Sequence, residues 1–72
     1  MTNTYCIIKV EDISKVDFNL LVTKDAESLV KSNDETKCII EWAGEQPAFI
    51  NTIEVVGVYT HEKILNILGS GF

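Results

Sequence analysis

The amino-acid sequence predicts an α+β fold, an antiparallel sheet of roughly three to four strands with a central β-hairpin and a C-terminal helix packed on one face. The 72 residues allow one domain, and a chain of this length buries only about 60% of the surface that its unfolded form exposes. Hydrophobic residues make up 46% of the chain. They are grouped into strand-like and helix-like runs, which indicates a packed core over residues 1–72 rather than disorder.

The first element is a strand over Thr4–Val10, because TYCIIKV is rich in β-branched and aromatic residues. Its alternating residues form two sets. We expect the first set to face the core, namely Cys6, Ile8 and Val10. We expect the second set to be partly covered, namely Tyr5, Ile7 and Lys9. Apolar residues in both sets predict an inner strand.

The next segment, Glu11–Lys24, fits neither helical nor strand spacing. We interpret residues 12–15 as a turn, followed by either one helical turn or a short irregular strand over residues 18–22. In both alternatives Phe18 and Leu21 pack inward.

Residues 28–42 predict the central hairpin. Two strand-like runs flank the polar tetrapeptide Asn33-Asp34-Glu35-Thr36, which is typical of a hairpin loop built around a type I turn. In the second run, alternation places Cys38, Ile40 and Trp42 together on the core face.

After the hairpin, Pro47 predicts a short helical turn over residues 47–52. Residues 54–59 (EVVGVY) predict another strand, in which Gly57 indicates a bulge or the close approach of another backbone. Thr60 is a good N-cap for a helix over residues 61–68. Its apolar stripe is expected to cover the sheet: Ile64, Leu65, Ile67 and Leu68. We expect residues 69–72 to form a flexible tail after Gly69.

The charge balance restricts the partners of the protein. The chain has 11 carboxylates against six basic residues, all of them lysines, and a formal net charge of −5. Phosphate backbones are repelled, and no guanidinium group is present for bidentate recognition, so we expect no nucleic-acid binding. A protein partner with a basic surface is favoured, although solubility alone also explains this acidity.

The sequence contains no motif for a catalytic, cofactor or metal site. Cys6, Cys38 and His61 lack the paired spacing of metal ligands, and no glycine pattern indicates a bound nucleotide. We expect both cysteines to be reduced and buried. Carboxylate pairs such as Glu41 with Glu45, or Glu54 with Glu62, stay open as metal or proton sites. We therefore expect no enzyme activity and no cofactor.

No leader and no run of about 18 apolar residues is visible, which predicts a cytoplasmic protein without a membrane segment. The best interface candidates are Trp42, Glu45, Pro47 and Phe49, because aromatic side chains beside acidic ones serve as anchors. The alternative is that Trp42 and Phe49 belong to the core. A sheet edge is the second candidate surface, for a partner or a second copy, and we expect Lys37 and Glu41 to blunt one edge.

Three segments together resemble a known group of proteins: Cys-Ile-Ile-Glu-Trp at residues 38–42, Pro-Ala-Phe at 47–49, and YTHEKILNIL at 59–68. The chain from Thr4 to Leu68 looks like the small acidic proteins of marine tailed phages, especially cyanophages. This resemblance implies a phage origin and the cytoplasm of an infected bacterium, and no known activity. The leading hypothesis is a small acidic protein-binding module, a phage accessory protein that binds and modulates a host protein. The alternative is a self-associating structural or accessory protein without enzymatic activity.

Overall fold

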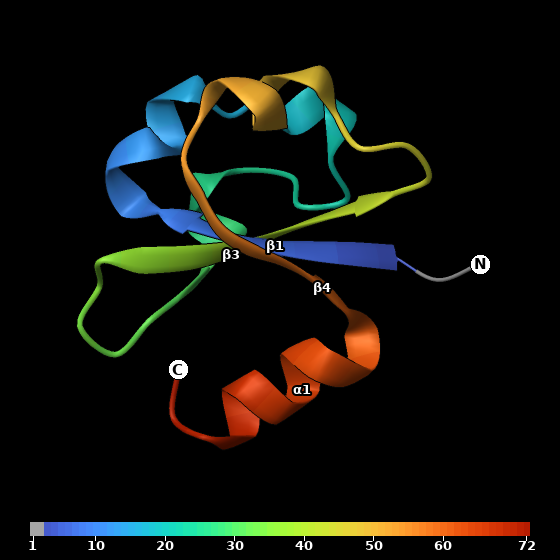
Figure 1. The fold of residues 1–72 in the computed structure, drawn as a ribbon. Helices are drawn as coiled ribbons and strands as arrows, with labels where there is room; N and C mark the ends of the chain where they lie inside the picture. Colours follow the sequence, from blue (N-terminus) through green and yellow to red (C-terminus); the bar gives the residue numbers. More distant parts are fainter. Residues whose placement is uncertain (1–2) are drawn as a thin grey trace.

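The fold is a four-stranded antiparallel sheet with a single α-helix on one face (Figure 1). It was obtained as a computed structural model that describes residues 3–72. The strand order is β2-β3-β1-β4. The elements are β1 (Asn3–Lys9), β2 (Val30–Lys31), β3 (Lys37–Ala43), β4 (Val55–Thr60) and α1 (His61–Gly69). The predicted α+β class, the antiparallel sheet and the C-terminal helix are confirmed. The predicted hairpin is present as β2 and β3, but its central position is wrong, because β2 is a two-residue strand at the edge of the sheet.

Four short 3-10 helices connect these elements: η1 (Val10–Lys15), η2 (Phe18–Leu20), η3 (Ala26–Ser28) and η4 (Ala48–Thr52). Aspartates cap two of them, since Asp17 accepts from the Asn19 N–H and Asp25 from the Ser28 N–H. Of the two alternatives for residues 18–22, the helical turn is confirmed. Pro47 is the N-cap residue of η4, so this helix starts at Ala48, one position after the predicted start.

β1 is the inner strand that the sequence predicts. Cys6 lies opposite Ile40 of β3 on one side and opposite Val58 of β4 on the other. The β1–β4 register shifts between Ile7 and Ile8, which pair with residues 57 and 55 and leave Val56 as an extra residue in β4. The bulge therefore lies directly beside Gly57, where the sequence predicted one. A Cβ at Gly57 would overlap the Tyr59 phenol ring, so the group that approaches this glycine is a side chain and not another backbone.

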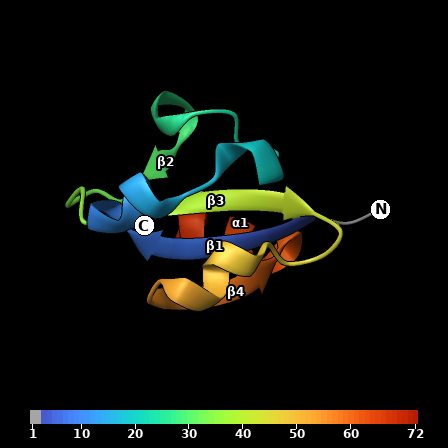
Figure 2. The ribbon, with the colours of Figure 1, turned by 90° about the horizontal axis from the view of Figure 1, so that it is seen from above.

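Both faces of the sheet are covered, one by the 3-10 helices and the other by α1 (Figures 1 and 2). We call these the turn face and the helix face. The turn-face core is formed by Cys6, Ile8, Leu29, Cys38, Ile40, Trp42 and Ile50. Half-buried Phe18 and Leu21 pack against it, as predicted. The helix-face core is formed by Ile7, Ile39 and Ile64. Ile7 is thus buried rather than partly covered, because α1 lies over it.

The β2–β3 loop is held by the carboxylate of Asp34. Its Oδ1 accepts hydrogen bonds from Ser32 Oγ (2.6 Å), Thr36 Oγ1 (2.7 Å) and the Thr36 N–H (3.1 Å). These bonds, that of Ser32 first, hold the pKa of Asp34 well below its usual range. Glu35 takes the left-handed conformation (φ 58°) that closes the turn.

Two expectations for the C-terminal segment need correction. In α1 only Ile64 is buried, while Leu65 and Leu68 are exposed, because the helix contacts the sheet along a narrower stripe than its apolar residues offer. The predicted tail is held in place. Phe72 packs against the helix-face core, and its carbonyl oxygen accepts a hydrogen bond from the Asn33 N–H at 2.8 Å.

Candidate protein-binding site

The four interface candidates from the sequence do not form an exposed aromatic surface. Trp42 is only 2% exposed and lies in the turn-face core. Pro47 is buried, and Phe49 is half-buried against the same core. Glu45 is the exposed member of the set. Trp42 belongs to the inward set of β3, and the chain after it folds over the sheet. The aromatic side chains of Trp42 and Phe49 therefore pack in or against the core.

The two cysteines are unsuited to nucleophilic chemistry. Both are fully buried and free in the turn-face core. Burial, with a smaller contribution from Cys38, raises the pKa of Cys6 to about 11. Burial also raises the pKa of Cys38. His61 is hydrogen-bonded to Tyr5, which alternates with Cys6 along β1 and so points to the opposite face.

A chain of polar side chains joins α1 to the sheet. Tyr5 Oη lies 2.9 Å from His61 Nδ1 and donates to Glu41 Oε2 at 3.2 Å. Asn3 Nδ2 donates to the same Glu41 oxygen. Burial and then the Glu41 charge raise the pKa of Tyr5, so the phenol stays a donor. These contacts anchor the start of α1.

The carboxylate pairs left open by the sequence are engaged elsewhere. Glu41 accepts from Asn3 and Tyr5, and Glu54 forms an ion pair with Lys9 at 3.0 Å. Within residues 3–72, no group of three or more histidine, cysteine, aspartate or glutamate side chains is placed to hold a metal ion.

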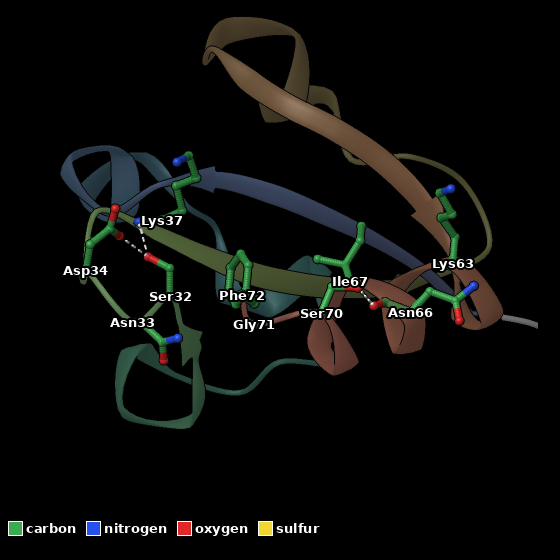
Figure 3. Close-up of a pocket in the computed structure, with 10 residues that line it drawn as sticks. All are labelled: Ser32, Asn33, Asp34, Lys37, Lys63, Asn66, Ile67, Ser70, Gly71 and Phe72. Atoms are coloured by element: carbon green, nitrogen blue, oxygen red, sulfur yellow. Dashed lines mark hydrogen bonds between the residues drawn. The ribbon is translucent and has the colours of Figure 1, made fainter.

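A depression of about 570 Å³ lies between α1 and the β2–β3 loop (Figure 3). Ile67 and Phe72 supply its apolar lining. Figure 3 shows Lys37 and Lys63 at opposite ends of it, so their charges do not converge on one point. Ser32 is already bonded within the loop, as a donor to Asp34 and an acceptor from the Lys37 N–H. The two lysines and Ser32 therefore do not form a pair of groups that could act together on one atom of a bound molecule.

The two edges of the sheet differ more clearly. β2, at one end of the strand order, has two residues, Val30 and Lys31. Farther along the same side of β3, the Val22 N–H donates to the Glu41 carbonyl, so this side is covered in two places. Lys37 and Glu41 were expected to blunt an edge. They lie in β3, which is an inner strand, so that expectation is wrong.

β4 forms the other edge (Figure 2). Its six residues, Val55–Thr60, include no charged residue and no proline. Val56 and Val58 are 48% and 47% exposed. Among residues 3–72, β4 pairs with β1 alone. The sequence predicted a sheet edge as a candidate surface but not that β4 forms it, because the uncharged run is visible in the sequence and the strand order is not.

Comparisons with known proteins identify no family. A scan against protein-family models found no match, and searches of the curated proteins and of the solved structures found no significant match. Within residues 3–72, no helix has the length and apolar character needed to cross a bilayer.

Proposed function

We propose that this chain is a small acidic protein-binding module that acts by binding rather than catalysis, and that β4 is the element that binds. The observation that supports this is the six-residue uncharged edge with half-exposed Val56 and Val58. An edge strand presents a row of unpaired N–H and C=O groups that an extended segment of another chain can pair with.

The contrast with β2 strengthens the assignment. Natural sheets blunt their edges with short strands, lysines and prolines. The β2 edge has the first two of these features, since it is two residues long and includes Lys31. The β4 edge has a bulge but neither a charge nor a proline. A bulge also protects an edge, but β4 lacks the other protective features, which leaves it better suited to pairing than β2.

Charge around the edge indicates the partner class. Backbone pairing and the valine contacts supply the affinity, whereas the net charge of −5 favours approach of a partner with basic flanks. The partner is therefore an extended, apolar protein segment flanked by basic residues. Under the resemblance to marine-phage proteins, it belongs to a bacterial host protein.

The test is affinity capture from a bacterial lysate with three baits: the wild type, Val58→Lys and Val30→Lys. The two substituted valines are matched, at 47% and 49% exposure, but lie on opposite edges. A lysine on an edge strand blocks pairing. We expect a partner that the wild type and Val30→Lys retain and Val58→Lys loses at least tenfold. Because the edge is uncharged, capture should survive high salt.

Thermal unfolding provides the folding control, since exposed substitutions of this kind change stability by about 0.5 kcal/mol or less. Equal capture by all three baits, or loss with Val30→Lys and not Val58→Lys, would contradict the β4 assignment.

A further inference from the structure

We propose that, when no such partner is bound, β4 pairs with β4 of a second copy of this chain, so that two copies form one continuous sheet about a two-fold axis. This inference rests on the proposed function, because it uses the same edge of the sheet. Antiparallel pairing of a strand with itself is the arrangement that a two-fold axis perpendicular to the sheet generates.

The charge pattern of the edge fits a second copy. Elsewhere, contact between two copies of a chain with net charge −5 brings carboxylates together. β4 is uncharged along its six residues, so self-pairing opposes no like charges there. Groups of both signs flank it: Lys9 neutralises Glu54 before the strand, and Glu62 and Lys63 follow it. In an antiparallel pair the start of one strand meets the end of the other, so both junctions contain both signs.

The exposed valines also fit this arrangement. Val58 lies opposite Cys6, so its side chain is on the turn face. A two-fold axis perpendicular to the sheet keeps the turn faces of both copies on the same side. The two Val58 side chains therefore lie on one face of the joined sheet, where pairing removes apolar surface from water. The two α1 helices share the opposite face.

The size of the edge predicts a weak dimer. Stable interfaces use roughly 20–30 residues from each partner, whereas β4 offers six. We expect a dissociation constant of ~10 μM to ~1 mM, which leaves the edge available to another strand at low concentration.

Sedimentation velocity from ~10 μM to ~1 mM tests the inference on the wild type, Val58→Lys and Val30→Lys, across the expected range of dissociation constants. For the wild type and Val30→Lys, the weight-average mass should rise with concentration toward twice the chain mass of 8.1 kDa. Val58→Lys should stay a monomer. Raising the salt should strengthen the dimer, because it screens the repulsion between two acidic copies.

A competition experiment leaves the protein itself unchanged. An excess of a synthetic peptide with the sequence of residues 54–61 should lower the dimer fraction of the wild type, and a scrambled peptide should not. A wild type that is monomeric at ~1 mM, or a Val58→Lys variant that associates equally well, overturns the inference. Retention of a Val58-dependent lysate partner by a monomeric wild type overturns the second copy but keeps the proposed function. A dimer that depends on Val58, together with no partner captured from the lysate, supports the second copy and contradicts an external partner.

Discussion

The turn face and the helix face of the sheet are both buried, but by different means. On the turn face, buried residues from β1, β3, η4 and the segment before β2 form one cluster around Trp42. On the helix face, Ile64 of α1 packs against Ile7 and Ile39 and supplies the buried contact of the helix. The first core depends on many segments distant in sequence, whereas the second depends on a single helix, in which Ile64 is the one buried residue. This difference predicts how each face responds to substitution.

Trp42→Ala should have the largest effect. Trp42 is the largest fully buried side chain and lies at the centre of the turn-face core. Removing such a side chain costs about 3–5 kcal/mol, because apolar contacts are lost and a cavity remains. A domain of this length has a free energy of unfolding of roughly 4–11 kcal/mol. Urea denaturation should therefore show a variant near the limit of folding. A loss below about 1 kcal/mol would contradict a central role for the turn face.

Ile64→Ala should have a smaller effect, confined to the helix face. Ile64 is 2% exposed and its neighbour Leu65 is 53% exposed, so Leu65→Ala is a matched control on the same helix. We expect a loss of about 2–4 kcal/mol for the first and about 0.5 kcal/mol or less for the second. Equal losses in urea denaturation would mean that α1 packs on the sheet by another side.

Much of the sheet and of the burial of its two faces could be predicted from the sequence. Strand alternation identifies Cys38, Ile40 and Trp42 as one buried set, and Thr60 correctly marks the start of α1, where its Oγ1 accepts from the Lys63 N–H. Those signals are local, since they depend on the period of a strand and on the first turn of a helix.

The signals that failed are long-range. The sequence does not indicate that Leu65 is exposed and that Phe72 packs against the core. Their burial depends on the angle of α1 and on the position of the β2–β3 loop. A sheet edge was predicted as a candidate surface, but for the same reason the sequence could not identify β4 as the strand that forms it. Residues 54–59 predict a strand, but strand order is decided by which strands pair across the whole chain.

Alkaline pH should lower the free energy of unfolding through the turn face, and we expect this effect to be the smallest of the three. Cys6 has a pKa of about 11 in the folded protein, against an ordinary cysteine pKa of 9.0, because the thiolate is disfavoured in the turn-face core. The unfolded chain therefore loses this proton first as pH rises, and the free energy of unfolding falls between pH 9 and about 11. The loss from Cys6 is about 2–3 kcal/mol at most, at about 1.4 kcal/mol per unit.

Cys6→Val tests this contribution, because valine keeps an apolar side chain at the site without a titrating proton. Urea denaturation at pH 8 and at pH 11 should show a smaller alkaline loss for Cys6→Val than for the wild type. Ile39→Val, a substitution in the helix-face core, should keep the wild-type pH dependence even though it lowers stability at both pH values. Titration of Cys38 in the turn-face core and of Tyr5 on the helix face is common to all three proteins and cancels in the comparison. An unchanged alkaline loss in Cys6→Val would place its origin at another group whose pKa burial raises, either Cys38 in the same core or Tyr5 on the helix face.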